Sequence, residues 1–158
     1  MKSNGPSNRA VGAGFEHVLQ VHANSQGVLF YKLPIGAKPI GRGKWIKQKT
    51  PFDYVMVHEG TAVFLDCKTL DKDHLTPSDM TPHQVQSLFA IWEHGGMAGY
   101  LVHFRPINKV VFFEADKLAG LQERTSLNVE DGEYLGTLSA LALGSLFYIS
   151  VPIKDIDG

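Results

Sequence analysis

The sequence predicts an α/β fold in which helices flank a mixed β-sheet, and three observations lead to this prediction. Two β-rich runs at 52–58 and 61–68 surround the tight turn Glu59-Gly60, which is typical of a β-hairpin. Apolar residues recur at helical spacing on both sides of that hairpin. Two further β-rich runs, AGYLVHF and KVVFFEA, follow the second helical segment. Strands and helices that alternate in this way favour a single mixed sheet.

The chain before the hairpin is expected to form a helix, a strand and an arm. The helix spans 9–23, Gly27 ends it, and the β-rich run at 28–33 follows as a strand. Segment 34–51 is rich in Gly, Pro and Lys, so we expect a protruding loop or a short two-stranded arm there. The alternative is a loop whose lysines solvate a buried Trp45.

An acidic, proline-containing loop at 71–80 follows the hairpin. Thr81 is then expected to cap a helix, with Pro82 at its first helical position, and Gly95-Gly96 to end it. The runs AGYLVHF and KVVFFEA form the next pair of strands.

The pattern is less clear in the last third of the chain. Residues 114–123 predict a short helix. Two alternatives stay open after Thr125: residues 135–144 could be helical, and residues 145–153 could form a strand.

Composition and length predict a single domain over residues 1–158. The chain has 158 residues, 44% of them hydrophobic, which is enough for a core without covalent cross-links. We expect a flexible N-terminus (1–8), the arm (34–51) and a C-terminal extension of uncertain structure (125–158). The single cysteine, Cys67, excludes a disulfide framework, and no apolar run is long enough for a membrane span. We therefore expect a cytoplasmic protein without a membrane partner, in a bacterial, archaeal or phage-infected cell.

The formal net charge of −1 conceals an uneven distribution of charged residues. Residues 17–52 contain six basic residues and no acidic one, whereas residues 53–158 contain seven basic and fifteen acidic residues. The six basic residues are Lys32, Lys38, Arg42, Lys44, Lys47 and Lys49. A basic segment beside an acidic body suggests a surface that binds a polyanion.

The hairpin places two carboxylates opposite each other. If Glu59-Gly60 is a two-residue turn, then Asp53 lies across from Asp66, with their Cβ atoms about 5 Å apart. Lys68 lies two residues beyond Asp66 and therefore on the same face of the strand. Facing carboxylates repel each other unless a cation lies between them, and Mg²⁺ prefers such oxygen ligands. The alternative is an exposed salt bridge between Asp66 and Lys68, with Asp53 at a strand end.

Other catalytic chemistries lack their motifs. The seven histidines include no H-E-x-x-H pair, and no G-x-S-x-G sequence is present. The glycines of GAKPIGRGK lack the G-K-[ST] sequence that a phosphate-binding loop needs.

The spacing D-x12-D-x-K, formed by Asp53, Asp66 and Lys68, resembles the PD-(D/E)xK nuclease signature. The preceding helix carries G-x-G-F-E (12–16), and the following helix opens with T-P-H-Q (81–84). Together with the later pair of strands, these motifs resemble RecU-type and archaeal Hjc-like Holliday junction resolvases. Two features depart from the family: Asp66 stands where RecU-type proteins usually have Glu, and the arm is short. The resemblance implies a restriction-endonuclease-like core with a short protruding basic arm.

The resemblance also implies a metal site for Mg²⁺, for which Mn²⁺ could substitute. It assigns Asp53 and Asp66 as primary ligands, with the backbone carbonyl of Cys67 as a third ligand. Glu16 would complete the site or serve a second ion. Lys68 would orient the attacking water.

Gln84 would then help to hold Lys68 or the water. The implied function is a metal-dependent, structure-selective endonuclease that nicks four-way DNA junctions symmetrically, as a homodimer, in recombination and repair. The alternatives are a repair or restriction-like nuclease of the same superfamily and a non-catalytic DNA-binding module. The residues expected to bind DNA are Arg9, Lys38, Arg42, Lys44, Lys47 and Lys49.

Overall fold

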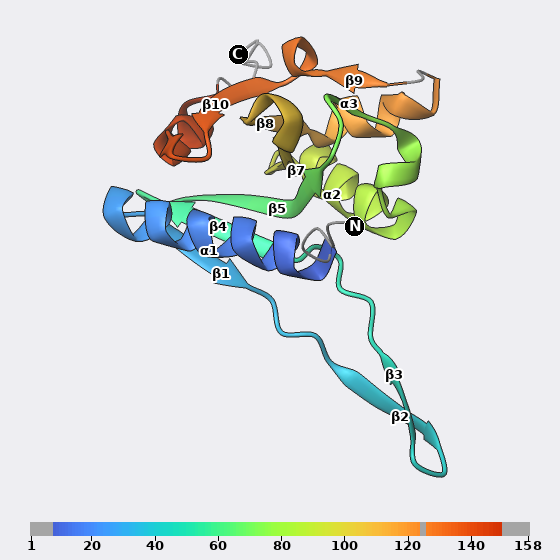
Figure 1. Cartoon of the computed structure of the whole chain (residues 1–158). Helices are drawn as coiled ribbons and strands as arrows, with labels where there is room; N and C mark the ends of the chain where they lie inside the picture. The colour runs from blue at the N-terminus through green and yellow to red at the C-terminus, as the bar shows by residue number, and fades with distance from the viewer. Residues whose placement is uncertain (1–7, 124–125, 150–158) are drawn as a thin grey trace, which may run out of the picture.

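The fold is known from a computed structural model, which describes residues 8–123 and 126–149 and contains a seven-stranded mixed sheet. The strands lie in the order β1-β4-β5-β7-β8-β10-β11. Their bounds are β1 Leu29–Lys32, β4 Tyr54–His58, β5 Thr61–Leu70, β7 Met97–Phe104, β8 Lys109–Glu114, β10 Glu133–Thr137 and β11 Ala140–Leu141. The helices are α1 Asn8–Gln26, α2 Pro82–Glu93 and α3 Ala115–Ala119. The predicted fold class, a mixed sheet flanked by helices, is confirmed (Figure 1).

Neighbouring strands are antiparallel except for β5 and β7, which run parallel because α2 lies between them in the chain. Side chains alternate across the sheet and so build two cores. Leu65 of β5 belongs to the core that α1 covers, together with Phe15 and Leu19. Tyr100 of β7 belongs to the core under α2 and α3, together with Leu88. Consecutive residues of β5 therefore face different surroundings.

The hairpin of β4 and β5 has the predicted register. Tyr54 pairs with Leu65, and His58 pairs with Thr61. Glu59 and Gly60 have φ values of 49° and 81°, so both turn residues are left-handed. This conformation suits a two-residue hairpin turn, and it favours glycine at the second position.

The expected arm is a two-stranded ribbon formed by β2 (Ala37–Gly41) and β3 (Lys44–Lys47), which extends away from the sheet (Figure 1). Every residue of both strands is exposed, and the side chain of Trp45 is 65% exposed. The two-stranded arm is thus the correct alternative, and the loop around a buried Trp45 is wrong.

Both readings of the C-terminal segment are wrong within the described residues. Segment 133–141 forms β10 and β11, and Leu143–Tyr148 form a 3-10 helix. Pairing of β10 with β8 overrides the helical pattern of 135–144, because the edge of the sheet offers unpaired backbone groups to this segment. Residues 150–158 lie outside the described residues, as do 1–7 of the expected flexible N-terminus.

The remaining short elements connect the sheet and the helices. They are β6 His74–Leu75, β9 Leu127–Asn128, η1 Pro77–Asp79, η2 Arg105–Ile107, η3 Gly120–Glu123 and η4 Val129–Asp131. Strands β6 and β9 pair with each other beside the main sheet. Among the described residues, no helix has the length and apolar character that a membrane span requires.

The first prediction concerns the independence of the arm. The backbone N–H of Gln48 donates to the carbonyl of Gly36 at 2.8 Å, so a two-residue Asn-Gly turn can join these residues. Replacing 37–47 with this turn should change the midpoint of thermal unfolding by less than about 4 °C, because it removes only exposed residues. Circular dichroism provides the measurement. Loss of a cooperative transition would contradict the independence of the arm.

Candidate active site

The two aspartates of the hairpin lie side by side on the face of the sheet that α2 covers. The backbone N–H of Asp53 donates to the carbonyl of Leu65 at 3.2 Å and so extends the β4–β5 pairing by one residue. Asp53 thus lies just before β4 and beside β5, and its carboxyl interacts directly with that of Asp66, so the two carboxyls lie together as the spacing predicted.

Asp66 is almost fully buried, with 1% of its surface exposed. Its Oδ1 accepts a hydrogen bond of 3.1 Å from the backbone N–H of Cys67. Its Oδ2 is buried and has no hydrogen-bond partner within the described residues. Burial, and then the neighbouring Asp53 carboxyl, raise the pKa of Asp66 to about 8. Ionising both carboxyls of the pair at once is therefore unfavourable unless a cation compensates the second charge.

Two side chains from different segments hold the carboxylate of Asp53. The hydroxyl of Thr50 donates to Asp53 Oδ1 at 3.0 Å, and Nε2 of Gln84 donates to the same oxygen at 3.1 Å. Burial acts to raise the pKa of Asp53, but Asp66, these donors and the charge of Lys68 outweigh burial and lower it. Gln84 thus contacts Asp53, whereas the resemblance implied a contact with Lys68 or the water.

Lys68 lies on the same face as Asp66, two residues further along β5. Its positive charge acts to lower the pKa of both aspartates. Among the described residues, none forms an ion pair or a hydrogen bond with the ammonium group of Lys68. The ammonium group is therefore available to a further anion.

Sequence reasoning missed Thr50 and Tyr100. Tyr100 is fully buried and lies beside Asp66 in the parallel register of β5 and β7. Its hydroxyl accepts a hydrogen bond of 3.3 Å from the backbone N–H of Thr81, and burial followed by the Asp66 charge raises its pKa. Only knowledge of the β5–β7 pairing could have identified Tyr100. The position of Thr50, three residues before Asp53, was a weak local signal.

Glu16 lies elsewhere, on the α1 side of the sheet. Its Oε2 accepts a hydrogen bond of 3.1 Å from the hydroxyl of Tyr54, and it forms an ion pair of 3.3 Å with Lys32. The Cys67 side chain packs on this side too. Within residues 8–123 and 126–149, no group of three or more His, Cys, Asp or Glu could hold a metal ion. The structure therefore does not bring Glu16 to the aspartate pair.

The aspartate pair nevertheless fits a hard divalent cation. Mg²⁺ typically takes one or two carboxylates and completes its shell with water and phosphate oxygens. The unpartnered Oδ2 of Asp66 is a buried acceptor that a cation would satisfy. Repulsion between the two carboxylates would also be relieved.

The residues expected to bind DNA gather on the arm. Lys38 and Lys44 lie in its strands with Lys47, Arg42 lies in the turn between the strands, and Lys49 lies at its base; all five are exposed. Arg9 lies in the first turn of α1, but its side chain falls outside the described residues.

Comparison with known protein families settles the resemblance. The model of the family RecU, recombination protein U, matches residues 18–132 of the 158. The chain belongs to the RecU family. This membership confirms the expected assignment as a Holliday junction resolvase, and with it a nuclease that acts in DNA recombination.

A solved structure supports the fold. A Holliday junction resolvase, Hjc from Archaeoglobus fulgidus, matches this chain with a TM-score of 0.54 and 18% identity. The match covers 78% of this chain and 95% of the archaeal chain, so the similarity spans nearly the whole of that protein. The expected restriction-endonuclease-like fold is thereby confirmed. A search of curated proteins finds no significant match.

The second prediction concerns the aspartate pair without DNA. Mg²⁺ should raise the midpoint of thermal unfolding by about 5 °C at saturation, because a bound cation offsets the repulsion between Asp53 and Asp66. Asp66→Asn should lose most of this shift. Asp71→Asn is the control, because this exposed carboxylate pairs with Arg105 and not with the aspartate pair. An unchanged midpoint of the wild type in saturating Mg²⁺ and Mn²⁺ would argue against a metal site here.

Proposed function

We propose that the RecU family member described here nicks four-way DNA junctions by metal-dependent hydrolysis, with Asp53, Asp66 and Lys68 at the reacting phosphate. One observation carries this proposal: a buried carboxylate with an unpartnered oxygen faces a second carboxylate, beside a lysine without a partner among the described residues. A pure DNA-binding module has no need for this repulsive pair, because like charges disfavour the folded state.

Each side chain of the site has a distinct role in this proposal. Asp53 and Asp66 would hold the divalent ion, with the carbonyl of Cys67 as a further ligand, and the ion supplies Lewis-acid stabilisation of the phosphate. Lys68 orients the attacking water and stabilises the charge that develops on the phosphate. Gln84 keeps the Asp53 carboxylate in place.

Glu16 is not included in this ligand set. Its carboxylate contacts Tyr54 and Lys32 on the opposite face of the sheet. Because Tyr54 directly follows Asp53, Glu16 supports the start of β4 rather than the reacting phosphate.

The arm supports selectivity for branched DNA. Lys44 and Lys47 are three residues apart in β3, so they project from opposite faces of the ribbon. An exposed ribbon with cations on both faces suits a gap that phosphates line on two sides, such as the open centre of a junction. Two symmetric nicks require two active sites, so we infer a homodimer. We expect this reaction to take place in the cytoplasm.

Cleavage of synthetic DNA tests the proposed function. A four-way junction, a flap and a plain duplex of the same sequences are incubated with and without Mg²⁺. Paired nicks in the junction alone, only with metal, support the proposal. Equal cleavage of the flap or the duplex would instead favour a repair or restriction-like nuclease.

The third prediction separates the chemistry from binding. Asp53→Asn and Asp66→Asn should abolish cleavage but bind junctions at least as tightly, because each removes a negative charge near phosphate. Lys68→Ala should lose at least about a hundredfold in single-turnover rate, the scale of one preorganised charge-stabilising group. Lys109→Ala, at an exposed lysine outside the site, serves as the control. A folded Lys68→Ala protein with the wild-type rate would exclude Lys68 from catalysis.

The fourth prediction concerns the arm. Neutralising Lys44 and Lys47 with Gln should flatten the slope of log affinity against log salt by about two units if both lysines contact phosphate. Junction affinity should fall more than duplex affinity. Filter binding over a range of salt concentrations provides both values. The matched control is Lys109→Gln with Lys117→Gln, which removes the same charge from exposed positions outside the arm. An equal effect of both double variants would assign the change to net charge alone.

A further inference from the structure

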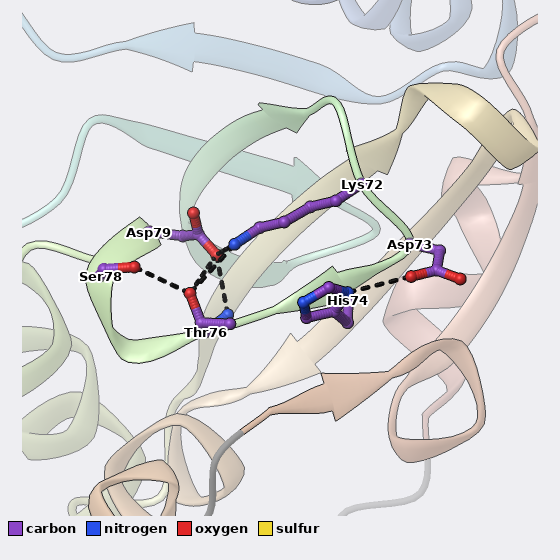
Figure 2. A network of polar contacts seen from close by, with 6 residues as sticks. All are labelled: Lys72, Asp73, His74, Thr76, Ser78 and Asp79. Carbon is purple, nitrogen blue, oxygen red and sulfur yellow. Dashed lines mark hydrogen bonds and ion pairs between the residues drawn. The ribbon is translucent and has the colours of Figure 1, made fainter.

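A cluster of polar contacts lies in the loop between β5 and α2 (Figure 2). Asp79 Oδ2 accepts hydrogen bonds of 2.8 Å from both the backbone N–H and the hydroxyl of Thr76. Lys72 Nζ lies 2.7 Å from the same oxygen, and it donates to the Thr76 hydroxyl at 3.1 Å. We call Lys72, Thr76 and Asp79 the loop clamp.

The loop clamp is stronger than an ordinary surface ion pair. The side chain of Asp79 is only 15% exposed, and that of Lys72 is 33% exposed. Three donor groups converge on one carboxylate oxygen, and such charge-assisted bonds are stronger than neutral ones. Burial acts to raise the pKa of Asp79, but the hydrogen bonds from Lys72 and Thr76 outweigh burial and lower the pKa. The carboxyl of Asp79 is therefore ionised at neutral pH.

The clamp stands between two segments that carry active-site residues. Lys72 follows β5, the strand of Asp66 and Lys68, within two residues of its end. Asp79 ends the 3-10 turn η1, and α2 begins three residues later at Pro82. Holding Lys72 to Asp79 therefore fixes the start of α2 relative to the end of β5.

The helix α2 has no side-chain cap of its own to fix its start. Thr81 occupies the N-cap position that the sequence predicted, but its side chain makes no capping hydrogen bond. Its backbone N–H donates instead to the hydroxyl of Tyr100. Gln84, the residue that holds Asp53, lies in the first turn of this helix. The position of Gln84 therefore depends on the packing of α2 in the core and on the loop that precedes the helix.

We propose that the loop clamp positions Gln84, and through Gln84 the carboxylate of Asp53, for the reaction. Lys72, Thr76 and Asp79 are positioning residues in this assignment, because none of them contacts the aspartate pair. The inference rests on the proposed function for its effect on rate, but its effect on Gln84 can be measured without DNA or metal.

The fifth prediction tests the positioning role of the loop clamp with two variants, only one of which changes the net charge. Asp79→Asn removes the charge, whereas Thr76→Val removes only the hydroxyl and leaves the net charge unchanged. Each should lower the single-turnover rate on a four-way junction about tenfold, because small misplacements of catalytic groups are costly, and should leave junction affinity unchanged. In a Gln84→Ala background, each should change the rate by less than about twofold, because residues that act through one another are not additive.

A second readout does not depend on activity. In the metal-free protein, the side-chain amide of Gln84 gives a ¹⁵N–¹H NMR signal that Gln84→Ala removes and thereby identifies. Asp79→Asn and Thr76→Val should shift this signal toward the value of a solvent-exposed glutamine. Asp71→Asn is the matched control, because it breaks an ion pair of the same loop (Asp71 to Arg105, 2.9 Å) that lies outside the clamp.

The outcomes distinguish the inference from the proposed function. An unchanged Gln84 signal in folded Asp79→Asn and Thr76→Val, or full rate losses in the Gln84→Ala background, would overturn the positioning role. If Asp66→Asn cleaves junctions at the wild-type rate, the proposed active site fails. The NMR signal would then still decide whether the clamp positions Gln84.

Discussion

The apposition of two carboxylates, Asp53 and Asp66, is the constraint on which the rest of the site depends. A charge is costly to bury, and two adjacent like charges oppose folding unless hydrogen-bond donors or a cation compensate them. Nearby groups do so in part: the N–H of Cys67 donates to Asp66, and Gln84 donates to Asp53. Asp66 Oδ2 keeps no partner among the described residues. The fold thus tolerates an electrostatic cost at one point, which is typical of functional sites.

The alternation of side chains along β5 decides what surrounds this pair. Leu65 and Cys67 pack toward α1, whereas Asp66 and Lys68 turn toward α2. The helix α2 connects β5 to the parallel strand β7. Its first turn supplies Gln84, which donates to Asp53. The crossover helix α2 therefore brings Gln84 to the aspartate pair of the hairpin.

The sequence predicted what local rules determine and missed what distant pairing determines. The hairpin register followed from the Glu59-Gly60 turn, and the arm followed from a segment poor in core residues. The neighbour Tyr100 required knowledge that β7 pairs with β5. The strand at 133–137 required knowledge that β8 would offer a free edge, since its own pattern resembled a helix. Glu16 was expected at the metal, but periodicity cannot say which face of the sheet a helix covers.

The contacts of Asp53 show why the short D-x12-D-x-K spacing does not identify an active site by itself. Its backbone N–H donates to Leu65, its carbonyl accepts a hydrogen bond of 2.8 Å from the N–H of Leu33, and its carboxylate accepts from Thr50 and Gln84. These partners come from the end of β1, the base of the arm, β5 and α2. The spacing of Asp53, Asp66 and Lys68 can arise by chance in any hairpin, but only tertiary structure brings the four partners to one residue. Since the arm joins the core between Leu33 and Thr50, both of its ends contact Asp53 directly. The base of the arm and the aspartate pair are therefore directly connected, whereas the exposed strands β2 and β3 take no part in this contact.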